Sequence, residues 1–340
     1  MPDKIGFWQN VTSTIDWCEI NYEVTFYIVE FWNTISNLLM IFLPLYGLYW
    51  SFRQNSSKKF NKFRVPNSVL ACFFALMMVG CGSWLFHMTL LYEMQLLDEL
   101  PMVFGAGIAL YALVDVLISI RKFDSELHRV KSKNVKSKLF LLKFFDVKTN
   151  LAILISFYCL SVAYVYVYIW RSPVFHQIAF GLIILLLLII YFFSYFSFLR
   201  TYTMPNKLVA LIVFYIILAF LFWNIDNNFC DYLREYRSSV ENLFGLDKDT
   251  FFHGLIRVLV ILLKSLSEFH SHWHLFTCYA AFLGILFLIQ VNYEQHLRQL
   301  KILHQQRLIG SKLCHMYYFF TVNESEKNKC PLIFVLKKSK

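Results

Sequence analysis

The sequence has few charged residues for a chain of its length. Of its 340 residues, 16% are Asp, Glu, Lys or Arg and 58% are hydrophobic. Two soluble domains, which this length would otherwise suggest, need a more highly charged surface. The long apolar windows also lack the alternating pattern of membrane strands and exceed their length of about 10 residues. These absences favour an all-α, polytopic membrane protein, because lipid satisfies no open backbone groups.

Seven apolar windows are long enough to cross a membrane as helices, which takes about 20 residues each. They cover residues 32–52, 68–90, 96–120, 151–170, 174–199, 208–229 and 266–291. We therefore predict a bundle of seven transmembrane helices over residues 32–291. The first window is expected to carry no chemistry of its own, and residues 254–266 are expected to form an interfacial helix.

A leucine-rich run is missing from the N-terminal segment, which argues against a cleaved secretory signal. Positive charges are concentrated in alternate connectors, and 25 of the 32 Lys and Arg residues fall on the side of the C-terminal tail. By the positive-inside rule, the N-terminal segment 1–31 is expected in the lumen and the basic tail 292–340 in the cytosol. The net charge of +10 then reflects topology and anionic lipid, and no nucleic-acid partner is expected.

Cysteines are scarce outside the predicted spans and the tail. Of the eight cysteines, only Cys18 and Cys230 fall in lumenal segments, where an oxidising environment would let them form a disulfide. Two separate free thiols are the alternative, because the sequence gives no Cα separation. The glycosylation sequon that begins at Asn10 also lies on the lumenal side, whereas those at Asn55 and Asn323 face the cytosol.

The most informative polar residues interrupt the second and third windows. Ser83 and His87 lie four residues apart and therefore share one face of a helix, and Asp98 follows after a short turn at residues 90–95. A single histidine in a membrane helix is often only a hydrogen-bonded packing residue. An intramembrane carboxylate, however, usually faces a cavity or a partner. We therefore interpret the three residues as one polar site at the lumenal boundary.

Further histidines begin the seventh window. His270 and His274 are also four residues apart, the spacing of helical zinc sites, whereas His272 points about 200° away from them. The predicted topology places His87 at the same membrane level as this pair. Three neutral imidazoles form the kind of zinc site that leaves a fourth position open for water. Cys278, one turn beyond His274, is a weaker alternative ligand.

A zinc site beside a carboxylate predicts hydrolysis. Zinc lowers the pKa of a bound water to about 7, and Asp98 is expected to act as the general base. Ser83 is expected to hydrogen-bond the developing oxyanion or to position the water. The membrane setting selects a lipid substrate, whose acyl chains would lie against the apolar third to sixth helices.

Oxygen-bearing side chains are concentrated just before the first window. They are Asp16, Glu19, Asn21, Glu23 and Glu30, all within fifteen residues. Such oxygens suit Ca²⁺, but their spacing is not that of an EF-hand loop. Composition alone favours a solvated acidic segment.

Four segments resemble those of the alkaline ceramidase family, in the same order along the chain. They are IDWCEINYEVTFYIVEFWNTISNL (15–38), GSWLFHMTLLYEMQLLDELPM (82–102), FWNIDNNFC (222–230) and the histidine stretch HSHWH (270–274). The resemblance implies a seven-helix amidase that hydrolyses ceramide to a sphingoid base and a fatty acid in endoplasmic reticulum or Golgi membranes. Long basic loops, an enlarged segment at 231–265 and a longer tail depart from the family pattern.

The resemblance also implies roles for individual residues. It implies a catalytic Zn²⁺ on His87, His270 and His274, with Asp98 and Ser83 as the catalytic groups. It implies a Ca²⁺ site, in place of the solvated segment above, made of Asp16, the Trp17 carbonyl, Glu19, Asn21 and Glu30. The disulfide between Cys18 and Cys230 matches the family's pattern as well.

The tail ends in KKSK, so that Lys337 and Lys338 resemble a dilysine retrieval signal read by cytosolic coat proteins. A merely basic tail is the alternative.

Two other functions are compatible with a seven-helix chain. One is a receptor similar to the adiponectin and progestin receptor family, with a structural zinc, and the other is a G-protein-coupled receptor. The combination of Ser83, His87 and Asp98 favours the hydrolase, and the predicted lumenal N-terminus is opposite to that expected for the adiponectin-type receptors.

Overall fold

The computed structural model describes residues 5–56, 63–132, 138–197, 206–243 and 253–300. Within these ranges the chain is helical apart from the N-terminal segment and short turns, and the described residues contain no strand beyond an isolated bridge between Thr25 and Ile28. The helices are α1 (Phe31–Ser36), α2 (Leu38–Ser56), α3 (Asn67–Thr89), α4 (Tyr92–Ser132), α5 (Lys138–Tyr164), α6 (Pro173–Ser197), α7 (Asn206–Asn228), α8 (Cys230–Leu243), α9 (His253–Ser265) and α10 (Phe269–Leu300). A π-helical turn, Val165–Ile169, follows α5.

Seven segments of the described chain are long and apolar enough to cross a membrane. The first is Phe31–Ser56, which contains both α1 and α2. The others are Asn67–Thr89, Tyr92–Lys122, Val147–Ile169, Pro173–Phe196, Lys207–Asn228 and Phe269–Leu297. Each overlaps one predicted window, so the prediction of an all-α, polytopic membrane protein is confirmed. Its orientation stays a prediction.

Two boundaries differ from those predicted. The turn expected at residues 90–95 is shorter, because α3 ends at Thr89 and α4 begins at Tyr92. The last helix continues past residue 291, since Tyr293 and Leu297 are still buried against the bundle. The rest of the predicted tail, including Lys337 and Lys338, lies outside the described residues.

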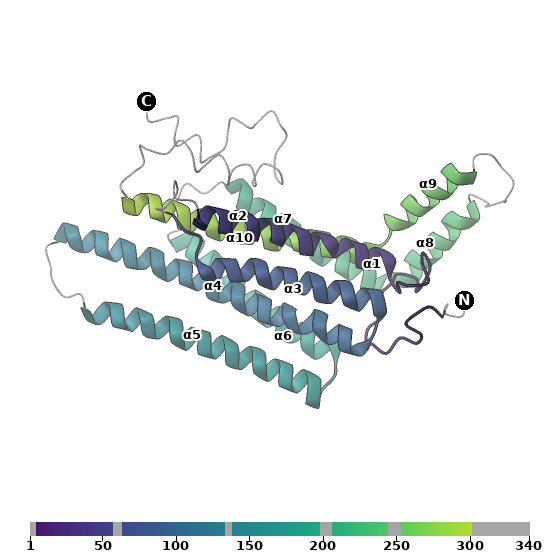
Figure 1. Ribbon diagram of the computed structural model, residues 1–340, viewed down its shortest axis with the longest axis horizontal. Helices are drawn as coiled ribbons and strands as arrows, with labels where there is room; N and C mark the ends of the chain where they lie inside the picture. Colours follow the sequence, from purple (N-terminus) through teal and green to yellow (C-terminus); the bar gives the residue numbers. More distant parts are fainter. Residues whose placement is uncertain (1–4, 57–62, 133–137, 198–205, 244–252, 301–340) are drawn as a thin grey trace, which may run out of the picture.

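The interior of the bundle is formed by α3, α4 and α10 (Figure 1). In their spans 56–61% of the most apolar stretch is buried, compared with 11–17% in the spans of α5, α6 and α7. In the packing, α3 lies against α2 and α4, α10 lies against α7 and α1, and α5 and α6 lie against α4. The outer helices expose large apolar side chains such as Phe157, Phe193 and Phe220, as expected of surfaces that face lipid.

α3 and α4 approach each other closely at Gly82. A Cβ atom at this position would overlap the backbone of Leu97 and Asp98. The two residues next to this contact, Ser83 on α3 and Asp98 on α4, are therefore held side by side.

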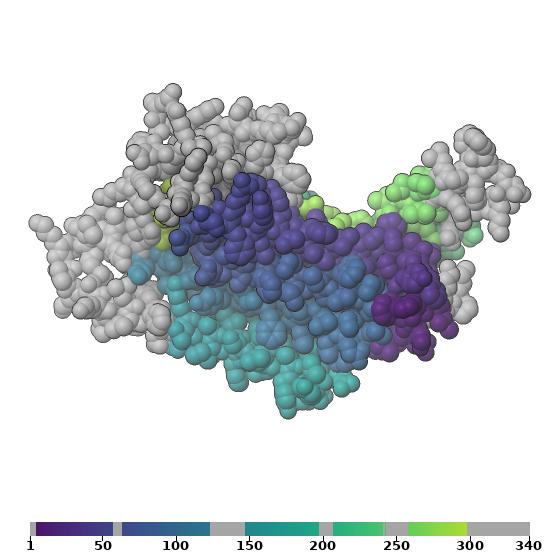
Figure 2. All heavy atoms as spheres, viewed as in Figure 1, coloured from purple at the N-terminus to yellow at the C-terminus, as the bar shows by residue number. Residues whose placement is uncertain are grey.

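The N-terminal segment 5–30 folds over one end of the bundle, which we call the capped end (Figure 2). The backbone N–H of Thr12 donates to the Leu90 carbonyl at 3.2 Å, and those of Val29 and Glu30 donate to the carbonyls of Met88 and His87 at 3.1 and 3.0 Å. The segment is thereby fastened to the end of α3. α8 and α9 project from this same end (Figure 1).

Candidate metal centre

Three histidine rings meet at the capped end of the bundle. His87 comes from the last turn of α3, and His270 and His274 come from the first two turns of α10. Their ring centroids are 5.1 Å apart for His87 and His270, 4.8 Å for His87 and His274, and 4.6 Å for His270 and His274. One ring nitrogen of each lies within 4.8 Å of the others. All three side chains are buried, at 0–2% exposure.

The ring of His87 is oriented by Glu30. Nδ1 of His87 lies 2.5 Å from a Glu30 carboxylate oxygen, and the Glu30 backbone N–H donates to the His87 carbonyl at 3.0 Å. When Glu30 is ionised it can only accept this hydrogen bond, which puts the proton of the neutral imidazole on Nδ1. The lone pair of Nε2 is then free, and Nε2 has no partner among the described residues.

The ring of His274 is oriented by the first span. Ser36 donates its hydroxyl proton to the Asn33 carbonyl at 2.8 Å, and its oxygen lies 2.8 Å from Nδ1 of His274. With its hydroxyl proton directed to Asn33, Ser36 can accept a hydrogen bond from Nδ1, which also lies 3.4 Å from the donor amide of Asn37. Nε2 of His274 has no partner among the described residues. The first span, which was expected to carry no chemistry of its own, thus contributes a residue that orients one of the three histidines. Its signal was the buried polar run Asn33, Thr34, Ser36 and Asn37 within an apolar segment.

The ring of His270 is held from two sides. The indole of Trp17 stacks on it, with ring centroids 3.6 Å apart and an interplanar angle of 22°. Asp226, at the end of α7, accepts the backbone N–H of His270 at 3.2 Å and so caps the first turn of α10. Nδ1 of His270 has no partner among the described residues.

These residues fit a zinc ion by their chemistry. Each ring has a buried nitrogen that lacks a hydrogen bond, which is costly unless another group satisfies it. Imidazoles whose second nitrogen donates to a carboxylate or hydroxyl are typical of zinc ligands. Cys278, the alternative ligand, lies in the apolar core beside Phe282 and outside the group of three histidines.

Ser83 and Asp98, the predicted catalytic groups, lie on facing sides of the contact between α3 and α4. Ser83 is one turn before His87 on α3 and is buried, and its side chain faces the Asp98 carboxyl across the close contact between α3 and α4. Asp98 itself is only partly buried.

His272 lies apart from the three histidines, as its place on the helix predicts. Its ring stacks on Phe222 of α7, with centroids 5.6 Å apart, and its Nδ1 lies 2.8 Å from the Glu268 carbonyl.

The five residues predicted to bind calcium lie in the segment that covers the histidines. Both Glu19 oxygens accept backbone N–H groups at the start of α1, from Trp32 at 2.7 Å and Asn33 at 2.9 Å. The Asn21 amide lies 3.4 Å from Asp16. Asp16, Glu19 and Glu30 do not form a group at metal-binding distance, since the three histidines are the only such group among the described residues.

The acidic groups of this segment nevertheless disfavour their own ionisation. Burial and the nearby Glu30 raise the pKa of Glu19 from 4.5 to about 8. Burial and the nearby Asp16 raise the pKa of Glu30 well above its usual value. A cation bound here would offset the repulsion between these carboxylates.

The Trp17 carbonyl, the remaining predicted calcium ligand, accepts a hydrogen bond from Arg234 at 3.3 Å. The disulfide implied by the family resemblance is present in the structure. Cys18 and Cys230 are bonded, with their Cα atoms 5.3 Å apart. It joins the N-terminal segment to the start of α8.

Comparison with known proteins gives the family of the chain. The family model named Ceramidase matches residues 9–309. Alkaline ceramidase 3 of Mus musculus is 35% identical over 288 residues, which cover 84% of this chain and 86% of the mouse protein. Alkaline ceramidase YPC1 of Saccharomyces cerevisiae is 31% identical over 298 residues, covering 86% and 79%. A putative alkaline ceramidase of Dictyostelium discoideum is 27% identical over 307 residues, covering 87% and 92%.

These matches favour the enzyme hypothesis over either receptor hypothesis. The family model covers most of the chain, and two relatives exceed 30% identity over more than four fifths of it. On this evidence, the chain belongs to the alkaline ceramidase family.

Proposed function

We propose that this protein is a zinc-dependent amidase that hydrolyses the N-acyl bond of ceramide to a sphingoid base and a fatty acid, with activity supported by calcium. The observation that carries the proposal is the group of three buried histidines, each with an unpartnered ring nitrogen, beside Ser83 and Asp98. The family of the chain supplies the substrate class.

The metal would be held by Nε2 of His87, Nε2 of His274 and a ring nitrogen of His270. Bound there, Zn²⁺ supplies a Lewis acid that polarises an amide carbonyl and makes water acidic enough to react at neutral pH. Glu30 and Ser36 keep the protons of two ligand rings on Nδ1, so that the coordinating nitrogens stay unprotonated.

Asp98 and Ser83 would move the proton and stabilise the negative charge. Asp98 accepts the proton that water loses as its oxygen bonds to the amide carbon, and returns it to the amine nitrogen as the C–N bond breaks. The Ser83 hydroxyl donates a hydrogen bond to the carbonyl oxygen, on which negative charge develops. The products are a fatty acid and the free amine of the sphingoid base.

The membrane setting accounts for a lipid substrate. The site lies at one end of the membrane spans, and the outer helices of the bundle are apolar. An acyl chain could therefore lie among the helices while the amide reaches the histidines. Calcium would bind the acidic segment around Asp16, Glu19 and Glu30 and brace Trp17 and Glu30, which contact two of the metal-binding histidines.

The proposal predicts which substitutions remove activity. In full-length protein purified in detergent, Asp98→Asn should lower the release of sphingoid base from ceramide by at least about 100-fold, the usual range for loss of acid–base catalysis. His87→Ala removes a proposed metal ligand and should lower it at least as much. Metal analysis should find zinc in the wild-type protein and in Asp98→Asn, but not in His87→Ala.

The matched control is His272→Ala, which removes a histidine from the same helix that faces Phe222 instead of the site. It should keep both zinc and most of the activity. Undiminished turnover by His87→Ala, or active wild-type protein without zinc, would contradict the proposal.

We also propose that the protein is located in the endoplasmic reticulum or Golgi. Cytosolic coat proteins would recognise Lys337 and Lys338. Replacing both lysines with serine should move the protein toward later compartments in fluorescence microscopy. An unchanged distribution would leave these lysines without a retrieval role.

A further inference from the structure

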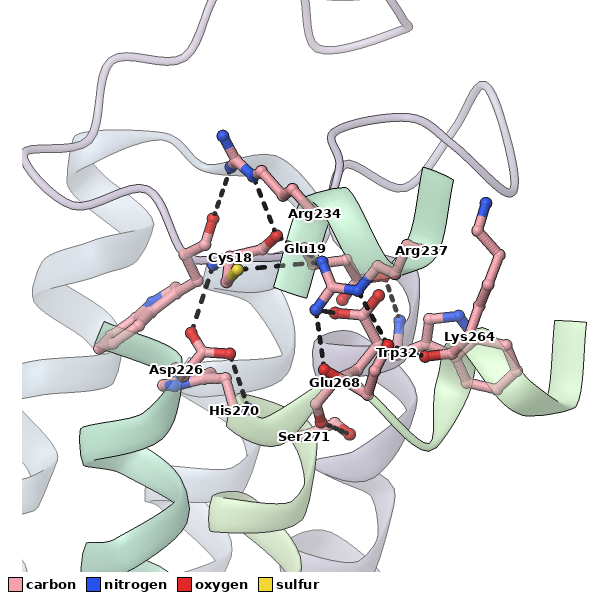
Figure 3. A network of polar contacts seen from close by, with 12 residues as sticks. Cys18, Glu19, Trp32, Asp226, Arg234, Arg237, Lys264, Glu268, His270 and Ser271 are labelled. Atoms are coloured by element: carbon pink, nitrogen blue, oxygen red, sulfur yellow. Dashed lines mark hydrogen bonds and ion pairs between the residues drawn. The ribbon is translucent and has the colours of Figure 1, made fainter. Parts of the chain in front are cut away.

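A buried polar network lies beside the metal centre and joins three parts of the chain that are distant in sequence (Figure 3). It consists of residues from the N-terminal segment, from α7 and α8, and from the start of α10. Arg237 is fully buried, with 0% exposure, and Asp226 and Cys18 are each 2% exposed. Burying charged groups is costly, so the network calls for an explanation beyond packing.

Asp226 forms one half of the network. One of its carboxylate oxygens accepts the backbone N–H of Cys18 at 3.3 Å, and the other accepts the backbone N–H of His270 at 3.2 Å. A single carboxylate therefore bridges the peptide that follows Trp17 to the first turn of α10.

Arg237 forms the other half. Its guanidinium donates to the Cys18 carbonyl at 2.8 Å and to the Ser267 carbonyl at 2.8 Å. It also donates to the Ser267 hydroxyl at 3.0 Å and pairs with the Glu268 carboxylate at 2.9 Å. Arg237 thus holds the other side of Cys18 to the two residues that immediately precede α10.

The two halves together act as a clamp on Cys18. Asp226 accepts a hydrogen bond from the N–H of Cys18, and Arg237 donates one to the Cys18 carbonyl. Both side chains also bond to residues at the start of α10. The disulfide alone cannot do this, because it joins Cys18 to the start of α8 and leaves the position of α10 open. The neighbouring Trp17 ring stacks on His270.

We propose that Asp226 and Arg237 are positioning residues, which hold His270 ready for the metal by tying the Cys18 peptide to the start of α10. This inference rests on the zinc site proposed above. A buried ion pair is weak evidence for stability, since apolar residues of similar size often stabilise a fold as well or better. Fixing the geometry of a neighbouring ligand is a use of the pair that apolar residues cannot replace.

The test measures zinc affinity directly. Full-length Asp226→Asn and Arg237→Lys proteins would be purified, stripped of metal and titrated with zinc against a competing chelator. Asn keeps the shape of Asp226 but offers one acceptor oxygen instead of two. Lys keeps the charge of Arg237 but not the planar fork that reaches several acceptors at once. Zinc binding should weaken by about 10–100-fold in both, the usual effect of losing a group that supports a metal ligand.

The control is Arg234→Lys. Arg234 also contacts the Cys18 carbonyl, at 3.3 Å, but it is exposed and does not bridge to α10 in the contacts of Figure 3. Its zinc affinity should stay within about 3-fold of wild type, since exposed charged contacts contribute little. Non-reducing gels should show the disulfide intact in all variants.

The outcomes separate this inference from the proposed function. Wild-type zinc affinity in both clamp variants, with a lower melting temperature alone, would mean that the network only stabilises the fold. Should Arg237→Lys fail to fold, the near-isosteric Asp226→Asn decides the question by the same titration. A wild-type protein that binds no zinc would overturn the proposed function and this inference together.

Discussion

At the scale of single residues, the site is built from contacts that leave one ring nitrogen of each of the three histidines without a hydrogen bond among the described residues. His87 and His274 have different partners, a carboxylate and a hydroxyl, but in both rings the contact is made by Nδ1 and Nε2 has no partner among the described residues. Such outer partners set the orientation and basicity of a metal ligand. Glu30 has two roles in these proposals, because it orients His87 and also belongs to the acidic segment proposed to bind calcium.

The acidic segment leads to a prediction about pH. Folding raises the pKa of Glu19 from 4.5 to about 8, so between these pH values the folded protein binds more protons than the unfolded protein. The free energy of unfolding should therefore fall as pH rises through this range. Calcium favours the ionised carboxylates, and the rise in melting temperature that it causes should be several degrees larger at pH 8.5 than at pH 6.

The measurement is thermal unfolding of the purified protein with calcium or with a chelator, at each pH. Glu19→Gln, which cannot ionise, should show a smaller dependence on pH. An equal calcium effect at both pH values in the wild-type protein would place the calcium site elsewhere.

At the scale of helices, the proposed catalysis requires that α3 and α4 approach closely. Gly82 permits backbone contact at the level of the site, and this contact brings Ser83 to Asp98. The end of α3 is equally constrained, because Leu90 terminates the helix in a left-handed conformation with φ of 46°. This conformation is strained for a residue other than glycine, and such strain is often found at functional sites.

Gly82→Ala should therefore lower kcat by about 10–100-fold, since displacement of a catalytic group by about 1 Å can cost 100-fold. The added methyl group would push α4 away from α3 and move Asp98 from the histidines. Zinc binding should change less, because the three histidines are on α3 and α10.

Gly105→Ala is the matched control on α4. A Cβ atom there would meet Ala75 at 3.6 Å and Val79 at 3.9 Å, which are ordinary contacts. Its steady-state kinetics with ceramide should be close to wild type. Equal activity in both variants would show that the close approach at Gly82 does not position Asp98.

At the scale of the whole molecule, the arrangement puts all proposed chemistry at one end of the bundle. The N-terminal segment, the start of α8 and the start of α10 converge there around one disulfide (Figure 1). The distribution of Lys and Arg predicts that this end faces the lumen, where the disulfide would be stable.

Glycosylation tests that orientation. Asn10 begins a sequon at the capped end and is exposed, so protein made in eukaryotic cells should carry a glycan there, seen as a mobility shift on a gel after glycosidase treatment. Asn10→Gln should abolish the shift, whereas Asn323→Gln should not. A mobility shift that depends on Asn323 would contradict the predicted topology and support the opposite orientation.

Much of the site could be predicted because its residues stand out chemically from their surroundings. Ser83, His87, Asp98, His270 and His274 are polar side chains in apolar helices. Helical spacing and alternating topology were enough to place them at one level. The supporting residues were harder to predict. Ser36 and Arg237 are ordinary in sequence, and only their neighbours in space give them a role.

By itself the sequence determined the fold class, the seven spans and the three histidines, because hydrophobic length and helical periodicity are local properties of the chain. Only the tertiary structure decided which side chains orient those histidines, since Glu30, Ser36 and Asp226 act across distances of 44–238 residues in sequence. It also decided that the proposed calcium residues lie against the proposed zinc site. Contacts of this kind depend on how helices pack in three dimensions, and no local pattern records them.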